Sequence, residues 1–184
     1  MALTESKILP LGTEAPRFFL QDTVSGNYMS LDDLKSDKAT VIMFICNHCP
    51  YVIHINRGLV DLANEYKRKG VSFIAISSND VEHYPDDDPD KMRLVAKILK
   101  YPFPYLYDKR QEVAKAYDAA CTPDFYVFNG DMKLTYRGRM DDSTPGNGKP
   151  VTGDELRNAI NSTLEDQPIE NQIPSMGCGI KWKS

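Results

Sequence analysis

Two cysteines, Cys46 and Cys49, stand three positions apart in the stretch FICNHCPYV, between an apolar run and a proline. A thiolate is the nucleophile of thiol-disulfide exchange, and an ordinary cysteine with a pKa of about 8.5 is mostly protonated at neutral pH. The first turn of a helix offers unpaired N–H groups and a positive dipole end, which stabilise an anion. Because Pro50 suits that first turn, we expect Cys46 to lie at a helix start with the lower pKa of the pair. His48 would tune it, and Cys49 would resolve a mixed disulfide.

Two other interpretations of this pair are a zinc site and two inert buried thiols. Tetrahedral zinc needs four ligands, and the sequence has no second CxxC and no HxxxH pair. The acidic run 86–88 is interpreted as a loop that leads into a helix. Other thiols and imidazoles would have to join through folding, namely those of Cys121, Cys178, His54 and His83. We therefore predict a redox couple with no metal and no organic cofactor.

The chain around the pair alternates between strand and helix. The β-branched run 40–45 lacks polar alternation, which is typical of a strand buried on both faces. A helix follows, with apolar residues every three to four positions, and then a second buried strand at 71–76. A hairpin is predicted around the turn 24–27. Further expected elements are helices near 92–99, 111–117 and 156–164, a short strand at 103–107 and a hairpin over 125–137.

Length and charge set the outer bounds. The 184 residues are expected to form one domain, 1–184, with an irregular tail from residue 167. A net charge of −4 argues against nucleic acid or an anionic membrane as partner. No apolar run approaches the roughly 18–20 residues that a membrane span needs, and no signal peptide is visible. These features predict a cytosolic protein, where four cysteines rarely form a structural disulfide framework.

The order of these motifs resembles the thioredoxin fold. The residues that carry the resemblance are Phe44 to Pro50 and, about 75 positions later, Cys121-Thr122-Pro123 at the start of a hairpin. The segment from Ala15 to Leu31 looks like the alkyl hydroperoxide reductase/thiol-specific antioxidant (AhpC/TSA) family. NHCPY and the tail 177–182 resemble its peroxiredoxin-like members that carry a thioredoxin-type CxxC. The resemblance covers about residues 10–184.

This resemblance implies an α/β fold with a central mixed sheet flanked by helices and an N-terminal β-hairpin extension. It also implies a cis Thr122-Pro123 bond that faces the CxxC and presents backbone groups to an extended substrate chain. The expected activity is thiol-disulfide oxidoreduction on protein or small-molecule disulfides. The electrons would come from a dithiol reductant such as thioredoxin, or from glutathione.

Two further thiols have open roles. Cys121 is either an apolar filler or a third thiol near the couple, and Cys178 is either a buried structural thiol or a resolving thiol. The tail contains Ile180 and Trp182, although disordered segments are usually poor in apolar residues. We therefore expect residues 173–182 to pack back on the domain, with Trp182 as the apolar anchor.

The rival within the family is a peroxidase that reduces hydroperoxides. Peroxiredoxins use a P-x-x-x-T-x-x-C motif and an arginine. When Cys49 is aligned with the final cysteine, Ile42 takes the proline position and Cys46 the threonine position. The expected arginine is replaced by Cys121-Thr122, unless Arg137 or Arg139 substitutes from the hairpin. From a different class, a non-catalytic binding module on the same fold would not need the intact CxxC.

Overall fold

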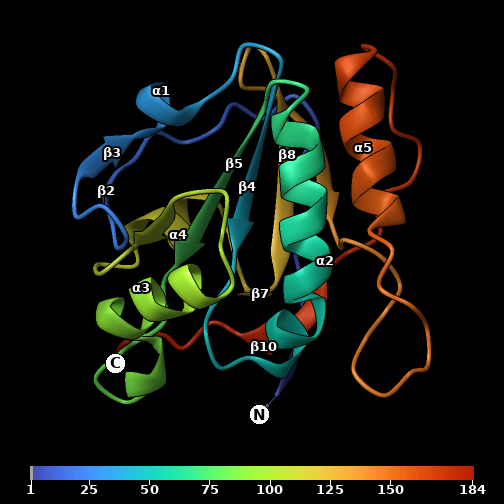
Figure 1. Cartoon of the computed structure of the whole chain (residues 1–184). Helices are drawn as coiled ribbons and strands as arrows, with labels where there is room; N and C mark the ends of the chain where they lie inside the picture. Colours follow the sequence, from blue (N-terminus) through green and yellow to red (C-terminus); the bar gives the residue numbers. More distant parts are fainter. Residues whose placement is uncertain (1) are drawn as a thin grey trace.

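A computed structural model describes residues 2–184, and its centre is a mixed sheet of seven strands (Figure 1). The strand order is β3-β2-β6-β5-β4-β8-β9. Strands β4, β5 and β6 run parallel, whereas the other neighbours are antiparallel. The strands are β2 (Phe19–Asp22), β3 (Tyr28–Ser30), β4 (Ala39–Phe44), β5 (Val71–Ser77), β6 (Tyr105–Tyr107), β8 (Asp124–Asn129) and β9 (Leu134–Gly138).

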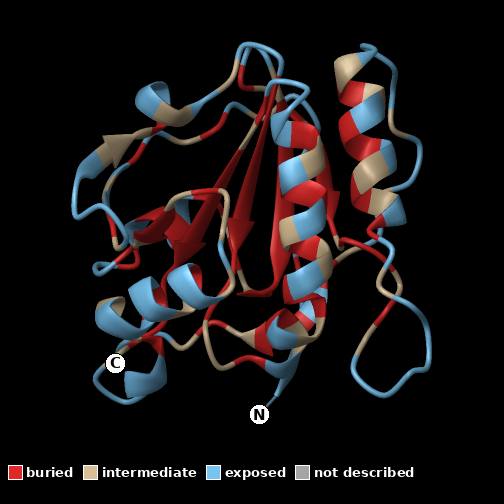
Figure 2. Cartoon of the chain, in the orientation of Figure 1, coloured by how far each residue is buried: buried red, intermediate tan, exposed pale blue. Residues whose placement is uncertain are grey.

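Strand β4 is buried along its whole length because helices cover both faces of the sheet (Figure 2). Val41 and Met43 belong to a core shared with α2 (Pro50–Lys67), α3 (Pro89–Ile98) and α5 (Asp154–Leu164). Ile42 and Phe44 point the other way, toward α1 (Leu31–Leu34) and α4 (Glu112–Ala116). Two cores therefore explain why the run 40–45 shows no polar alternation.

Helix α2 begins directly after the CxxC turn. Pro50 is its first helical residue, as the sequence predicts, and Cys49 rather than Cys46 is the N-cap residue. The Cys49 carbonyl accepts hydrogen bonds from the backbone N–H groups of Val52 and Ile53 at 3.0 and 2.9 Å. The helix buries the predicted apolar face, which includes Leu59. The packing of this face fixes the end of the helix that carries the thiols.

The N-terminal hairpin extension is present as β2 and β3, followed by a capped short helix. Ser30 accepts a hydrogen bond from the Asp33 backbone N–H at 3.1 Å, and the Asp33 carboxylate accepts one from the Ser30 N–H at 3.0 Å. This reciprocal capping box starts α1. Strand β2 then joins the main sheet through β6.

The tail after residue 167 is not wholly irregular, and here the sequence-based expectation is wrong. Strand β10 (Met176–Gly179) forms a separate antiparallel sheet with β1 (Leu3–Glu5) and β7 (Cys121–Thr122), in the order β1-β10-β7. It passes near the N-terminal end of α2 (Figure 1). The tail does pack on the domain, but Trp182 is 43% exposed, so it is not the anchor. Cys178 and Ile180 are the buried residues that hold the tail.

No helix within residues 2–184 combines the length and the apolar character that crossing a membrane requires.

Candidate functional site: a cluster of three thiols and a buried carboxylate

The two cysteines of the CxxC motif meet β7 and β10 at the N-terminal end of α2. The Cys46 Sγ lies 3.5 Å from the Thr122 Oγ1, and the Cys49 Sγ lies 3.5 Å from the Thr122 carbonyl oxygen. The Thr122-Pro123 peptide bond is cis, as predicted. Cys46 and Cys49 are 2% and 0% exposed. The structure thus places Thr122 against both thiols of the pair.

A third thiol completes this cluster. The Cys178 Sγ lies 2.7 Å from the Cys49 Sγ, and Cys178 pairs with Thr122 in the register of β10 and β7. All four cysteines are free thiols in this structure. Cys121 lies elsewhere, because its thiol is directed at the Ser175 carbonyl oxygen, 3.9 Å away. Of the two accessory thiols predicted from the sequence, the structure brings Cys178 to the couple and leaves Cys121 in the packing.

The charge of the cluster is centred on Cys49. Hydrogen bonding from the Cys46 thiol lowers the pKa of Cys49 to about 5, against the effect of burial, and the Cys178 thiol and the Val52 N–H contribute in the same direction. The same contact with Cys49 raises the pKa of Cys46, together with burial and the negative charge of Asp87. Burial and the neighbouring Cys49 raise the pKa of Cys178 to about 12.

The expectation that Cys46 has the lower pKa is therefore wrong for the reduced protein. The physical reason is that the Cys46 thiol, the Cys178 thiol and the Val52 N–H all stabilise the anion of Cys49. Cys46 instead lies among groups that disfavour its anion.

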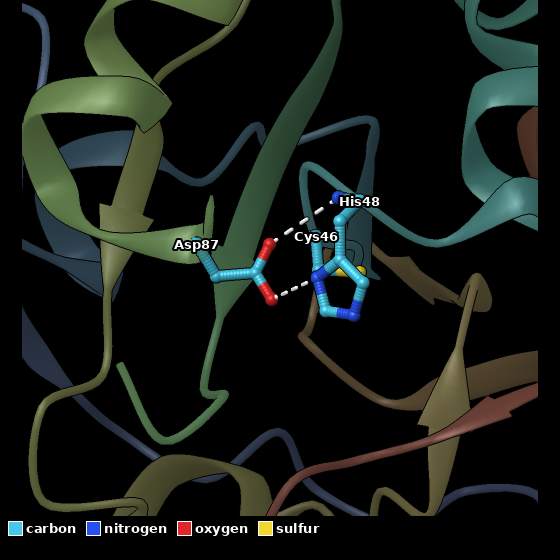
Figure 3. A group of neighbouring side chains, drawn as sticks. All are labelled: Cys46, His48 and Asp87. Atoms are coloured by element: carbon cyan, nitrogen blue, oxygen red, sulfur yellow. Dashed lines mark hydrogen bonds and ion pairs between the residues drawn. The ribbon is translucent and has the colours of Figure 1, made fainter. Parts of the chain in front are cut away.

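A buried carboxylate, which the sequence-based analysis missed, organises the outer side of the CxxC turn. Asp87 is 0% exposed and ends a short 3₁₀ helix, η1 (Pro85–Asp87). One of its oxygens accepts hydrogen bonds from the backbone N–H groups of Asn47 and His48 at 2.8 and 3.3 Å. The other accepts one from the Asn79 side chain at 2.8 Å and lies 2.6 Å from the His48 Nδ1 (Figure 3).

Asp87 therefore fixes both the backbone and the ring of His48. The His48 side chain is 19% exposed and stacks on Tyr84, with ring centroids 5.9 Å apart. A signal for Asp87 existed in the run 86–88, which precedes a helix. Nothing in the run, however, distinguishes the buried Asp87 from Asp86, whose side chain is 75% exposed.

Cys46, His48 and Asp87 each offer a metal-ligand atom, and these three atoms lie within 4.8 Å of one another (Figure 3). Both carboxylate oxygens of Asp87, however, already have two nitrogen neighbours each. His48 directs its Nδ1 at that carboxylate. These contacts favour a positioning role for Asp87 over metal ligation.

The structure changes the expected role of the Thr122 backbone. The resemblance to thioredoxin implied that Thr122 offers an open edge to a substrate chain. Strand β10 occupies that position instead, with Cys178 opposite Thr122 and Gly179 opposite Cys121. Pro123 is buried and lines a cavity of about 200 Å³ together with Tyr51, Ser175 and Met176. A substrate chain can use Thr122 only if β10 moves.

Neither hairpin arginine replaces the arginine of the peroxiredoxin motif. The Arg137 side chain is buried and donates to the Asp124 carboxylate at 2.9 Å. Arg139 donates two hydrogen bonds to Glu155, at 2.6 and 2.8 Å. Within residues 2–184, no hydrogen bond joins either arginine to Cys46 or Cys49.

Comparisons with known proteins agree with this architecture. Residues 11–137 match the AhpC/TSA family, and the chain belongs to this family. The crystal structure of an uncharacterized conserved protein from Geobacillus kaustophilus is 60% identical, with a TM-score of 0.97 over 100% of this chain and 97% of that chain. The thiol-disulfide oxidoreductase ResA of Oceanobacillus iheyensis is 28% identical over 141 residues, which are 74% of this chain and 69% of that protein.

A more distant structure defines the fold. The secreted disulfide oxidoreductase of Mycobacterium tuberculosis is 19% identical, with a TM-score of 0.61 over 79% of this chain and 95% of that chain. The predicted α/β thioredoxin-like fold, with its central mixed sheet and flanking helices, is therefore confirmed.

Proposed function

We propose that this protein is a thiol-disulfide oxidoreductase that cycles Cys46 and Cys49 between dithiol and disulfide. The observation that carries the proposal is the contact of both thiols with Thr122 of β7, at 3.5 Å from each sulfur, beside the N-terminal end of α2. This contact places the second sulfur next to any mixed disulfide that forms on the first. The resemblance to a named thiol-disulfide oxidoreductase supports the same activity.

In the proposed reaction, Cys46 is the attacking thiol. It adjoins Asn47 and His48, which are partly exposed, whereas Cys49 is enclosed by Cys178 and the Thr122 carbonyl. The Cys49 thiolate, which the Cys46 thiol stabilises, takes up the proton as Cys46 attacks. The attack joins Cys46 to one sulfur of the substrate and releases the other as a thiolate, which is protonated by water. Cys49 then attacks the Cys46 sulfur and releases the second substrate thiol.

His48 would supply and remove protons at this site. Its ring lies near Cys46, is oriented by Asp87 and reaches solvent. The electron donor, a dithiol protein such as thioredoxin or glutathione, stays a prediction, as does the cytosolic location. The intact cluster of thiols argues against the non-catalytic binding module.

The test is reduction of oxidised glutathione and of insulin by dithiothreitol, with hydrogen peroxide reduction measured in parallel. We expect disulfide turnover in the wild-type protein and a loss of at least about 100-fold in Cys46→Ser and Cys49→Ser. Cys121→Ser is the matched control, because its thiol is equally buried but contacts neither Cys46 nor Cys49, and it should keep the activity. Full disulfide turnover in both single variants would contradict the proposal.

A hydroperoxide reductase is the second candidate, and one observation favours it. The low pKa of Cys49 falls on the cysteine that aligns with the peroxidatic residue. The remaining features oppose it, because Ile42 and Cys46 occupy the other motif positions and both hairpin arginines pair with carboxylates. Peroxide turnover that needs Cys49 but not Cys46 would favour this candidate over the dithiol mechanism.

A further inference from the structure

Cys178 is held against Cys49 by a strand that is paired on both sides. A Cβ at Gly177 would come within 1.9 Å of the Thr122 carbonyl oxygen, so only glycine permits this close approach of β10 to β7. On the other side, β10 pairs with β1, with Leu3 opposite Cys178. The thiol is 4% exposed. Two neighbouring strands therefore set the 2.7 Å separation of the Cys49 and Cys178 sulfurs.

Burial in this small sheet does not by itself bring a thiol to Cys49. Cys121 lies in the neighbouring strand β7 and is 0% exposed, yet its thiol is directed at a backbone carbonyl. The Cys49 sulfur, in contrast, lies 2.7 Å from the Cys178 sulfur, and the thiols of Cys46 and Cys178 both lower the pKa of Cys49. It is thus the common neighbour of one thiol from its own CxxC turn and one from the C-terminal tail.

We propose that Cys49 is shared by two alternative disulfides, Cys46–Cys49 and Cys49–Cys178, and that Cys178 is a third redox thiol. This inference rests on the proposed function, since the first disulfide arises from the reduction of a substrate disulfide at Cys46. The Cys178 thiolate then attacks the Cys49 sulfur. A bond between Cys49 and Cys178 forms, the Cys46–Cys49 bond breaks, and Cys46 leaves as a thiolate that takes up the proton lost by Cys178. The exchange transfers no net electrons, and an external dithiol later reduces the second disulfide.

Oxidation of Cys49 makes it easier for Cys178 to form the thiolate that attacks the Cys46–Cys49 disulfide. In the reduced protein, contact with the electron-rich Cys49 sulfur is one cause of the raised Cys178 pKa, after burial, whereas Lys181 opposes it. Formation of the Cys46–Cys49 disulfide removes the negative charge on Cys49. One cause of the raised Cys178 pKa is therefore lost, whereas the lowering effect of Lys181 remains.

The three thiols would therefore have different roles. Cys49 and Cys178 would form the stored disulfide, which is buried next to β10. Cys46 would be returned to its reduced form beside His48 and Asp87. The oxidised enzyme would then still present a free thiol at the position of substrate attack.

The experiment maps disulfides after oxidation with oxidised glutathione, acid quenching, alkylation and peptide mass spectrometry. Its proteins are Cys46→Ser, Cys46→Ser/Cys178→Ser and Cys46→Ser/Cys121→Ser. We expect an intramolecular Cys49–Cys178 disulfide in Cys46→Ser, its loss in the Cys178 double variant and its retention in the Cys121 double variant. Absence of this disulfide in Cys46→Ser, or a Cys49–Cys121 disulfide in its place, would overturn the inference.

A second measurement uses the complete cluster and guards against a folding defect. In oxidised wild-type protein Cys46 should be available for alkylation, whereas in Cys178→Ser or Cys178→Ala it should be protected in the Cys46–Cys49 disulfide. The alkylated fraction of Cys46 should fall about tenfold or more, with unchanged circular dichroism. Equal protection in all three proteins would overturn the inference. If the wild-type protein reduces substrate disulfides but never forms the Cys49–Cys178 disulfide, the inference fails and the proposed function stands. If the Cys46–Cys49 disulfide never forms and no substrate disulfide is reduced, the proposed function itself fails.

Discussion

Asp87 shows how one buried carboxylate can hold both the CxxC turn and the imidazole ring of His48. Its four nitrogen neighbours include the backbone N–H groups of Asn47 and His48, which lie between the two cysteines. Hydrogen bonds to a charged acceptor are roughly twice as strong as neutral ones, so the carboxylate restrains the turn as well as the imidazole. Asp87 is therefore a positioning residue that acts through His48 and the CxxC turn.

The first prediction concerns Asp87→Asn. The amide keeps the shape of the carboxylate, but its NH₂ group must face either the Asn79 donor or the two backbone donors. We expect disulfide turnover to fall about tenfold or more and the free energy of unfolding to fall by about 1–3 kcal/mol, because buried donors lose their acceptor. Faster hydrogen exchange at the His48 amide would report the loosened turn. Asp86→Asn, an exposed neighbour, is the control; equal losses in both variants would refute the positioning role.

The second prediction concerns the ionisation of Cys49 in the reduced protein. The ultraviolet absorbance of thiolate, titrated in the reduced protein, should show a transition near pH 5 that belongs to Cys49. The lowered pKa means that Cys49 is ionised above that pH and protonated below it. The transition should vanish in Cys49→Ser. In Cys178→Ala it should move to higher pH, because alanine removes a hydrogen-bond donor that lowers the Cys49 pKa. A transition near pH 5 that survives in Cys49→Ser would restore Cys46 as the more acidic thiol.

At the scale of elements, β10 performs two tasks with four residues. It carries Cys178 to Cys49, and it covers the edge of β7 at Thr122. The second task has a consequence for substrate choice. In the proposed reaction, a small disulfide would need access only to Cys46, whereas an extended polypeptide that pairs with Thr122 would first have to displace β10.

The third prediction follows from the close approach of Gly177 to Thr122. Gly177→Ala would place a Cβ 1.9 Å from the Thr122 carbonyl oxygen, so β10 must separate from β7. We expect the rate ratio of insulin to oxidised glutathione reduction to rise several-fold, and the Ile180 amide, which donates to the Ala120 carbonyl at 3.0 Å, to exchange faster. Met176→Ala changes an exposed side chain of the same strand. It should leave the rate ratio and the Ile180 amide exchange unchanged. A constant rate ratio together with faster exchange would show that β10 does not limit access.

The elements that were predictable from the sequence are those whose local pattern and tertiary role agree. The run 40–45 and the amphipathic pattern after Pro50 identified β4 and α2, and Cys46 and Cys49 with them. Strand β10 was not predictable, because glycine disfavours strands and the reason for Gly177 is the carbonyl of a residue more than 50 positions away. The contact of Cys178 with Cys49, 129 positions apart in the sequence, was likewise set by the fold.

At the scale of the whole molecule, both ends of the chain converge on the thiol cluster. Strand β1 closes the small sheet over β10, and Ser6 and Ser175 exchange two hydrogen bonds at 2.8 Å, one backbone to backbone and one to the Ser6 hydroxyl. Farther along the tail, the Lys181 N–H donates to the Asn79 side chain at 2.9 Å, and the same Asn79 donates to Asp87. The tail is therefore connected to the carboxylate on one side of the cluster and to the N-terminus on the other.

The last prediction tests this closure by deletion of residues 2–6. Without β1, strand β10 keeps only the short β7 as a partner and loses the Ser6–Ser175 contacts, so the tail should open more often. We expect the alkylation rate of Cys178 in the reduced protein, resolved by peptide mass spectrometry, to rise about tenfold. This factor corresponds to a decrease of about 1.4 kcal/mol in the free energy of opening the tail. A global loss of this size would lower Tm by about 3–6 °C.

Leu3→Ser/Glu5→Gln is the matched control, because it changes only exposed side chains of β1 and keeps its backbone pairing with β10. Amide hydrogen exchange in β4, which is buried and paired on both sides in the main sheet, serves as an internal reference for global unfolding. If the deletion speeds Cys178 alkylation and β4 exchange equally, the N-terminus stabilises the domain as a whole; if it speeds only Cys178 alkylation, β1 is the strand that keeps the third thiol at the site.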